Sequence, residues 1–257
     1  MDLLAIPFGL AIGLIVGAVG GGGAILALPV LVYVLGEGVG PASTAALIVI
    51  AIAAAVGAGA RARDGHVCWR LALLFSAPAA VGSLGGALLS AEASPRVLIL
   101  AFVPVMLVAA FATWQRAGAG RREQDTGCPP AATPIVLSAG FAVGALTGFF
   151  GVGGGFMIVP VLALGLGLTF RRAVATSLVI ITLTGIAALT SHLLTGAAPN
   201  WGITAALACC TALGALGGTA IADRLPQAAL AKVFAVIVAL LALFLLADAT
   251  LLGGPPT

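Results

Sequence analysis

The stretch GLAIGLIVGAVGGGGAILALPVL, from Gly9 to Leu31, and the stretch GFAVGALTGFFGVGGGFMIVPVL, from Gly140 to Leu162, carry the same pattern of glycine and proline. The pattern repeats without a gap at a spacing of 131 residues, the separation of Gly9 from Gly140. Helix breakers at corresponding positions of two halves, inside apolar segments, indicate the substrate site of a membrane transporter. The repeated stretch therefore bears on both the architecture and the function.

The composition of the chain places it in a membrane. Of 257 residues, 61% are hydrophobic and 7% are charged, and the mean hydropathy is +1.24. Such a surface does not suit a water-soluble domain of this size, so we predict an all-α polytopic membrane protein. No Lys or Arg precedes the first apolar run, so we expect no cleavable signal peptide. A net charge of +3 is too small and too dispersed to indicate nucleic-acid binding.

The two copies of the pattern belong to a tandem duplication of the whole chain. We expect a first repeat over 1–114, a polar linker over 115–133 and a second repeat over 134–257. Each repeat has five apolar segments, and crossing a bilayer takes about 20 residues per helix. These segments are 3–19, 24–36, 42–60, 71–90 and 96–114, then 134–150, 155–168, 173–195, 201–222 and 226–247.

The first two segments of each repeat are predicted to form a hairpin. As one helix, 3–36 would be about 50 Å long, whereas the hydrocarbon core is about 30 Å thick. We expect the glycine cluster to turn the chain back, either as a re-entrant loop or as two short spans. Each repeat then crosses the membrane an odd number of times, which inverts the second repeat relative to the first.

The distribution of cations favours this inverted arrangement. With inverted repeats, ten of the eleven Lys and Arg residues lie on one face, and Arg96 alone lies on the other. Parallel repeats would divide the cations six to five. Because cytoplasmic loops carry the Lys/Arg excess, we predict that the linker is cytoplasmic and that both termini face away from the cytoplasm.

Residues typical of enzymes or metal sites are missing from this sequence. We find no Ser-His-Asp set, no cluster with metal-ligand spacing and no pair of buried carboxylates, so we expect no catalysis, no metal and no cofactor. The four cysteines show no disulfide or metal spacing, and we interpret them as small packing residues. Cys209 and Cys210 are the only residues that an intramembrane enzyme would have available as nucleophiles.

The backbone of the glycine clusters is the best candidate for a binding site. A helix that starts after a break has unpaired N–H groups, which can hold an anion without a buried cation. For the glycines spaced by four residues, such as Gly9, Gly13 and Gly17, close helix packing is the preferred interpretation. Hydroxyl groups that open the following helix are a second layer of candidates. The predicted substrate-binding residues are Gly21, Gly22, Gly23, Ala24, Gly153, Gly154, Gly155, Thr176 and Ser177.

The doubled glycine–proline pattern, with ATSL at Ala175–Leu178, resembles the TauE/SafE family, also called the sulfite exporter family. The resemblance covers nearly the whole chain. It implies a transporter that moves sulfite, sulfonates or related sulfur-containing anions across the bacterial inner membrane, often as an exporter. Where the second repeat has Thr-Ser, the first has Ala45-Ala46, so hydroxyl groups would contribute from one repeat only.

The leading hypothesis is therefore a secondary transporter in the inner membrane, whose partners are the lipid bilayer and a small anion. The alternatives are a channel, a carrier for another small solute, a membrane scaffold or an intramembrane enzyme. A cation carrier would normally have a buried carboxylate, and none is visible. The sequence leaves open whether the chain forms a homo-oligomer.

Overall fold

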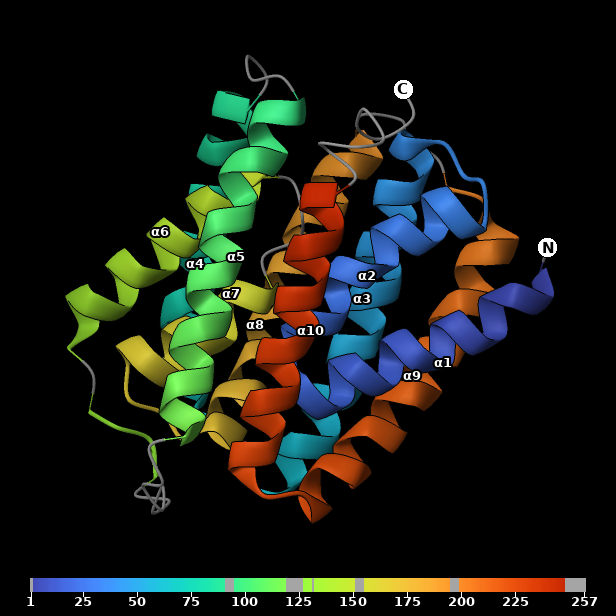
Figure 1. The fold of residues 1–257 in the computed structure, drawn as a ribbon. Coiled ribbons are helices and arrows are strands. Elements are labelled where there is room, and N and C mark those ends of the chain that lie inside the picture. Colours follow the sequence, from blue (N-terminus) through green and yellow to red (C-terminus); the bar gives the residue numbers. More distant parts are fainter. Residues whose placement is uncertain are drawn as a thin grey trace.

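The computed structural model describes residues 2–90, 95–118, 127–130, 132–150, 155–194 and 199–247, and every regular element in these ranges is a helix (Figure 1). The elements of the predicted first repeat are α1 (Asp2–Val19), η1 (Gly21–Gly23), α2 (Ala24–Pro29), η2 (Val30–Val34), α3 (Val39–Arg63), α4 (Trp69–Ser90) and α5 (Pro95–Gly118). Those of the second are α6 (Thr133–Phe150), α7 (Gly155–Pro160), η3 (Val161–Gly165), α8 (Phe170–Leu194), α9 (Trp201–Arg224) and α10 (Gln227–Ala247). The ten predicted segments are confirmed to within a few residues.

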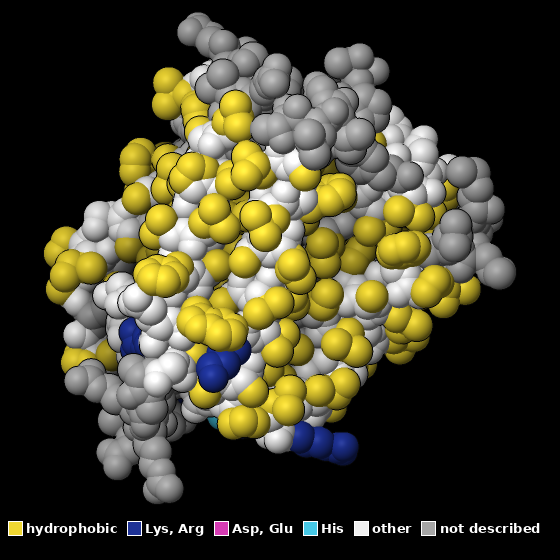
Figure 2. Space-filling view, viewed as in Figure 1, with side chains coloured by type: hydrophobic (Ala, Val, Ile, Leu, Met, Phe, Trp, Pro, Cys, Tyr) yellow, Lys and Arg dark blue, Asp and Glu magenta, His cyan; other side chains and the backbone are white. Residues whose placement is uncertain are grey.

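Seven of the described helices are long and apolar enough to cross a membrane: α3, α4, α5, α6, α8, α9 and α10. Figure 2 shows apolar side chains over the middle of one face, and Lys and Arg side chains toward its lower end. Large apolar residues such as Leu84, Val108 and Leu240 are exposed, as expected where lipid replaces water. The chain is a multi-pass membrane protein.

Each repeat places its first helix against the fourth helix of the other repeat. In Figure 1, α1 lies along α9 and α6 along α4. A Cβ atom added at Gly9 would lie 2.8 Å from the Cβ of Cys210, and those of Gly13 and Gly17 would meet the backbone of Thr211 and Ala215. Because both residue numbers rise together, α1 and α9 run in the same direction. The predicted glycine packing face is confirmed.

The contact between α6 and α4 has the same register. The missing side chains of Gly140, Gly144 and Gly148 let α6 approach the backbone at Phe75, Ala79 and Ser83, respectively. Helices α4 and α9 are related by a spacing of 132 residues, one more than in the glycine–proline stretch, as Trp69 and Trp201 show. Their equivalent glycines also make this contact: Gly82 and Gly86 lie against α6, and Gly214 and Gly218 lie against α1. Without side chains at these positions the backbones come close enough for extensive van der Waals contact, which drives helix association in lipid.

Equivalent helices of the two repeats meet in the centre. A Cβ added at Gly57 in α3 would lie 3.2 Å from Leu178 in α8, and one at Gly185 in α8 would lie 3.2 Å from Ala51 in α3. The residue number falls along one helix as it rises along the other. Helices α3 and α8 therefore run in opposite directions.

Helices α2 and α7 each continue into a wide helical turn that starts after proline. Pro29 precedes the π-helix η2, and Pro160 precedes the π-helix η3. The N–H of Leu35 donates to the carbonyl of Val30 over 3.1 Å, and Leu166 repeats this bond with Val161. Single π turns inside helices are found often at functional sites, and here they occur at matching positions of both repeats.

Candidate functional site

The first glycine turn reverses the chain as predicted. Gly20 has a φ of +80°, which glycine adopts without the strain that a Cβ imposes, and its N–H donates to the carbonyl of Val16 at the end of α1. Gly23 then lies back against α1, where an added Cβ would be 2.6 Å from the Val16 side chain and 2.8 Å from the carbonyl of Ile12. The predicted hairpin of the first repeat is confirmed.

The first glycine turn meets the start of α7, whereas the turn predicted at 151–154 lies outside the described residues. Gly155, at the start of α7, lies against Gly21, because a Cβ added at Gly155 would be 2.8 Å from the Cα of Gly21. Next to this contact, Gly20 packs against the hydroxyl of Ser177 in α8, where an added Cβ would lie 2.8 Å from the Oγ. Backbone from both repeats thus comes together beside a buried hydroxyl.

The structure brings together some of the predicted site residues and separates others. Gly21, Gly155 and Ser177 meet at the contact between the hairpins, and the Ser177 hydroxyl donates to the carbonyl of Val174 over 2.8 Å. Gly23 faces α1 instead. Gly22 lies in η1, and Ala24 is the first residue of α2. Gly153 and Gly154 lie outside the described residues.

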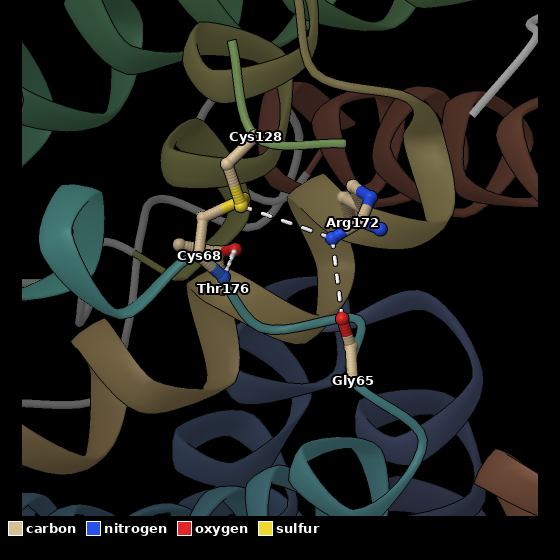
Figure 3. Close-up of a disulfide and its surroundings, with 5 residues drawn as sticks. All are labelled: Gly65, Cys68, Cys128, Arg172 and Thr176. Atoms are coloured by element: carbon tan, nitrogen blue, oxygen red, sulfur yellow. Dashed lines mark hydrogen bonds between the residues drawn. A yellow bond between two sulfur atoms is a disulfide. The ribbon is translucent and has the colours of Figure 1, made fainter. Parts of the chain in front are cut away.

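Thr176 is turned toward a loop between helices. Its Oγ1 accepts a hydrogen bond of 3.1 Å from the backbone N–H of Cys68, and both residues are buried. Cys68 forms a disulfide with Cys128, across 60 residues of chain (Figure 3). The interpretation of these two cysteines as packing residues was wrong, because pairing over such a distance depends on the fold and leaves no pattern in the spacing.

The disulfide lies in a group of interactions between the two repeats. A guanidinium nitrogen of Arg172 at the start of α8 donates to the carbonyl of Gly65 over 3.2 Å and lies 3.8 Å from the Sγ of Cys128 (Figure 3). Cys68 and Gly65 belong to the α3–α4 loop, and Cys128 to the linker. The loop, the linker and α8 are therefore joined at one end of the molecule.

An ion pair also joins the repeats at a helix end. Arg61 in α3 is 1% exposed, and its Nη1 lies 2.6 Å from the Oδ1 of Asp223 in α9. Arg171 in α8 is 3.8 Å from the same oxygen, and its Nη2 donates to three carbonyls at the end of α9. A buried guanidinium needs such a partner because an unpaired charge is costly in a low dielectric.

A cavity of about 100 Å³ opens beside Gly155. Helices α4, α6 and α8 each contribute one hydroxyl to its wall, from Ser83, Thr147 and Thr184. The other lining residues are apolar side chains and glycines: Leu47, Ile50, Ala51, Ala79, Val143, Gly144, Gly155, Ile158, Ile181, Gly185 and Ala188. Among the described residues that line it, none is charged.

The residues of this cavity were only partly visible in the sequence. Thr147 and Thr184 stand out there as polar positions in apolar helices, but nothing indicates that they share a wall with Ser83. The two repeats differ at these positions, since Val16, Ala53 and Ala215 are the equivalents of Thr147, Thr184 and Ser83. Asn200, another isolated polar residue, instead caps α9 by accepting from the N–H groups of Gly202 and Ile203.

The long apolar helices define a polytopic membrane protein, and short helices interrupted beside glycine and proline are typical of a membrane transporter. The model of the family "Sulfite exporter TauE/SafE" matches residues 5–245, and the chain belongs to this family. A probable membrane transporter protein of Xylella fastidiosa strain Temecula1 is 33% identical over 186 residues, 68% of each chain. Another, from strain 9a5c, is 32% identical over 194 residues, 72% of this chain and 71% of the relative. No solved structure matches.

Proposed function

We propose that this protein is a secondary transporter that exports small sulfur-containing oxyanions, such as sulfite or sulfonates, across the inner membrane. The observation that carries the proposal is the contact between Gly21 and Gly155. At this contact the first glycine turn lies against the start of α7, beside a cavity. Transporters bind their substrates at such junctions between discontinuous helices of two repeats.

An anion suits this junction for an electrostatic reason. Backbone N–H groups that lack a helical partner are costly in the membrane unless protein, water or a ligand satisfies them. Glycine leaves these donors accessible because no Cβ covers them. The Ser177 hydroxyl is buried beside Gly20. It could donate to the anion if it released its hydrogen bond to the carbonyl of Val174.

The opposite directions of α3 and α8 support an inverted relation between the repeats. Because these equivalent helices both have the length and hydropathy of membrane spans, equivalent ends of the two repeats would lie on opposite sides of the bilayer. We propose that the end with Arg61, Arg171 and Arg172 is cytoplasmic, following the Lys/Arg excess of cytoplasmic loops. Both termini would then be periplasmic.

In alternating access, the groups of helices that move together would differ from the two halves of the sequence. The glycine contacts join α1 to α9 and α4 to α6, and each of these pairs combines helices of both repeats. We propose that each pair moves as a unit and that the central pair of α3 and α8 forms the pivot. Substrate would be exposed to one side at a time at the junction of the hairpins.

The membrane potential can supply the driving force for export. Moving one negative charge out of a cell with a negative interior releases about 2.3 kcal/mol per 100 mV. An exporter of anions therefore needs no coupling ion, although a proton or ion gradient would add to this force.

The proposal is tested by flux through the purified full-length protein in liposomes. Sulfite and methanesulfonate are loaded inside, and their exit is followed with and without a potential that is negative inside. We expect saturable efflux that the potential accelerates, with choline flux at the level of empty liposomes. Absence of anion flux from a folded protein, or equal flux of choline, would overturn the proposal.

A further inference from the structure

We propose that the cavity between α4, α6 and α8 binds the tail of the transported anion and selects short tails that carry a hydrogen-bond donor. This inference rests on the proposed function and assigns a specificity site within it. The cavity shares Gly155 with the contact between the hairpins. An anion held by the backbone at that contact would therefore direct its other end into the cavity.

The size of the cavity limits the tail. At about 100 Å³ it is smaller than a cavity of about 150 Å³, which accommodates a benzene molecule. The cavity encloses a tail of about two to four heavy atoms, whereas a longer alkyl chain extends beyond it. Since no charged residue lines the wall, a second charged group on the tail would lose its hydration without gaining an ionic partner.

The hydroxyl groups in the wall are arranged as acceptors. Thr147 donates to the carbonyl of Val143 over 2.6 Å, and Thr184 donates to the carbonyl of Ile180 over 2.8 Å. Ser83 donates to the carbonyl of Ala80 over 2.8 Å. Each hydroxyl has one proton and two lone pairs, so the oxygens of these lining residues retain the capacity to accept from a ligand. A tail that ends in a hydroxyl or an amine supplies the matching donor.

The matching positions in the other repeat lack this arrangement. Val16, Ala53 and Ala215 take the places of Thr147, Thr184 and Ser83, and all three are fully buried. Val16 also packs against Gly23, so its side chain fills space beside the first hairpin. The two repeats therefore both supply glycine backbone at the junction, but only one of them adds hydroxyl side chains beside it. The tail of the anion is recognised on the side of α4, α6 and α8.

Two anions that differ by one hydroxyl test this inference. Ethanesulfonate and 2-hydroxyethanesulfonate compete against sulfite efflux from liposomes that contain the full-length protein, with hexanesulfonate as the long-tailed probe. We expect the hydroxylated anion to compete about 5-fold better than ethanesulfonate, the effect of one neutral hydrogen bond. Hexanesulfonate should compete least. Equal competition by all three sulfonates would overturn the inference and leave the proposed function standing.

A pair of matched threonine variants assigns the selection to the cavity. Thr184→Val removes an oxygen from the wall, whereas Thr182→Val removes one that donates to the carbonyl of Leu178 over 2.8 Å but does not line the cavity. We expect the 5-fold preference to disappear in Thr184→Val and to persist in Thr182→Val. Loss of the preference in both variants, or in neither, would contradict the assignment. Failure of the unmodified protein to transport sulfite or any sulfonate would overturn the proposed function as well.

Discussion

The hydroxyl oxygen of Thr176 in α8 accepts a hydrogen bond from the backbone N–H of Cys68, the residue whose side chain is joined to Cys128. A side chain in the second turn of α8 is thereby tied to the α3–α4 loop and, through the disulfide, to the linker between the repeats. This role differs from the predicted one of lining the substrate path. It also makes the disulfide part of the support for α8, which carries both Ser177 and Thr184.

The disulfide and the cations at this end of the molecule indicate different compartments. The Lys/Arg excess is typical of a cytoplasmic face, whereas disulfides persist mainly in oxidising compartments. We give the cations more weight because they determine orientation during insertion. In a cytoplasm that reduces thiols, Cys68 and Cys128 would then be paired only under oxidising conditions.

Removing the disulfide should lower the stability of the oxidised protein. We expect Cys68→Ser with Cys128→Ser to reduce the midpoint of thermal unfolding in detergent, and dithiothreitol to do the same to the unmodified protein. Restricting the unfolded chain by a loop of about 60 residues stabilises the folded state by about 4 kcal/mol. This is an upper value, because segments that remain in a micelle when unfolded are already restricted. Dithiothreitol should leave the double variant unchanged, and Cys209→Ala serves as the control. An unchanged midpoint in the double variant would contradict a structural role for this bond.

Equivalent tryptophans can report the relation between the repeats. Trp69 begins α4 and Trp201 begins α9, and both are exposed. In a protein without its natural cysteines, we expect a membrane-impermeant maleimide to label Trp201→Cys in intact cells, but Trp69→Cys only after permeabilisation. Labelling of both from outside would exclude inverted repeats. The reverse pattern would keep the inversion and place the disulfide in the periplasm.

The ion pair between α3 and α9 should contribute to stability through the burial of Arg61. Asp223→Asn leaves this guanidinium without its carboxylate at 2.6 Å. Because Asp223 is 41% exposed, we expect a loss of about 1–3 kcal/mol, below the 3–5 typical of a fully buried pair. Adding Arg61→Met should restore part of this loss. The exposed Asp64→Asn is the control, and an equal effect there would show that the pairing is not responsible.

The sequence predicted the elements of this fold well, because its signals are local. Glycine clusters, apolar run lengths and a repeated proline each act within a few residues, and they located the hairpin at Gly20–Gly23 and all ten segments. The stripe of Gly9, Gly13 and Gly17 predicted a close helix contact. It could not identify α9 as the partner, because a small-residue face fits many helices.

The candidate site was less accessible from sequence, since its parts come from distant helices. Gly21 and Gly155 were both predicted, yet their contact depends on how the hairpins of two repeats approach each other. Thr176 and Ser177 are neighbours in sequence, but a helix turns by about 100° per residue, so they face different surroundings. Ser83 carried no signal of its own, because an isolated serine in an apolar helix also satisfies its hydroxyl on the preceding turn.

The two glycine stripes should be equally sensitive to an added methyl group. Gly13→Ala would press a Cβ into the backbone of Thr211, and Gly144→Ala would do so at Ala79. Neither backbone can move aside as a flexible side chain would, so we expect each variant to lose about 1–3 kcal/mol of stability. The midpoint of thermal unfolding in detergent measures the loss.

Gly217→Ala is the matched control for both stripe variants. Gly217 lies in α9, as does the contacted Thr211, but an added Cβ there would meet nothing within 4 Å. Alanine favours a helix by about 1 kcal/mol over glycine, so this variant should unfold at the same or a higher temperature. A loss of stability in Gly217→Ala as large as in Gly13→Ala would mean that the effect of glycine is local to its own helix and does not depend on contact with a neighbouring helix. A loss confined to one stripe would contradict the equivalence of the α1–α9 and α4–α6 contacts.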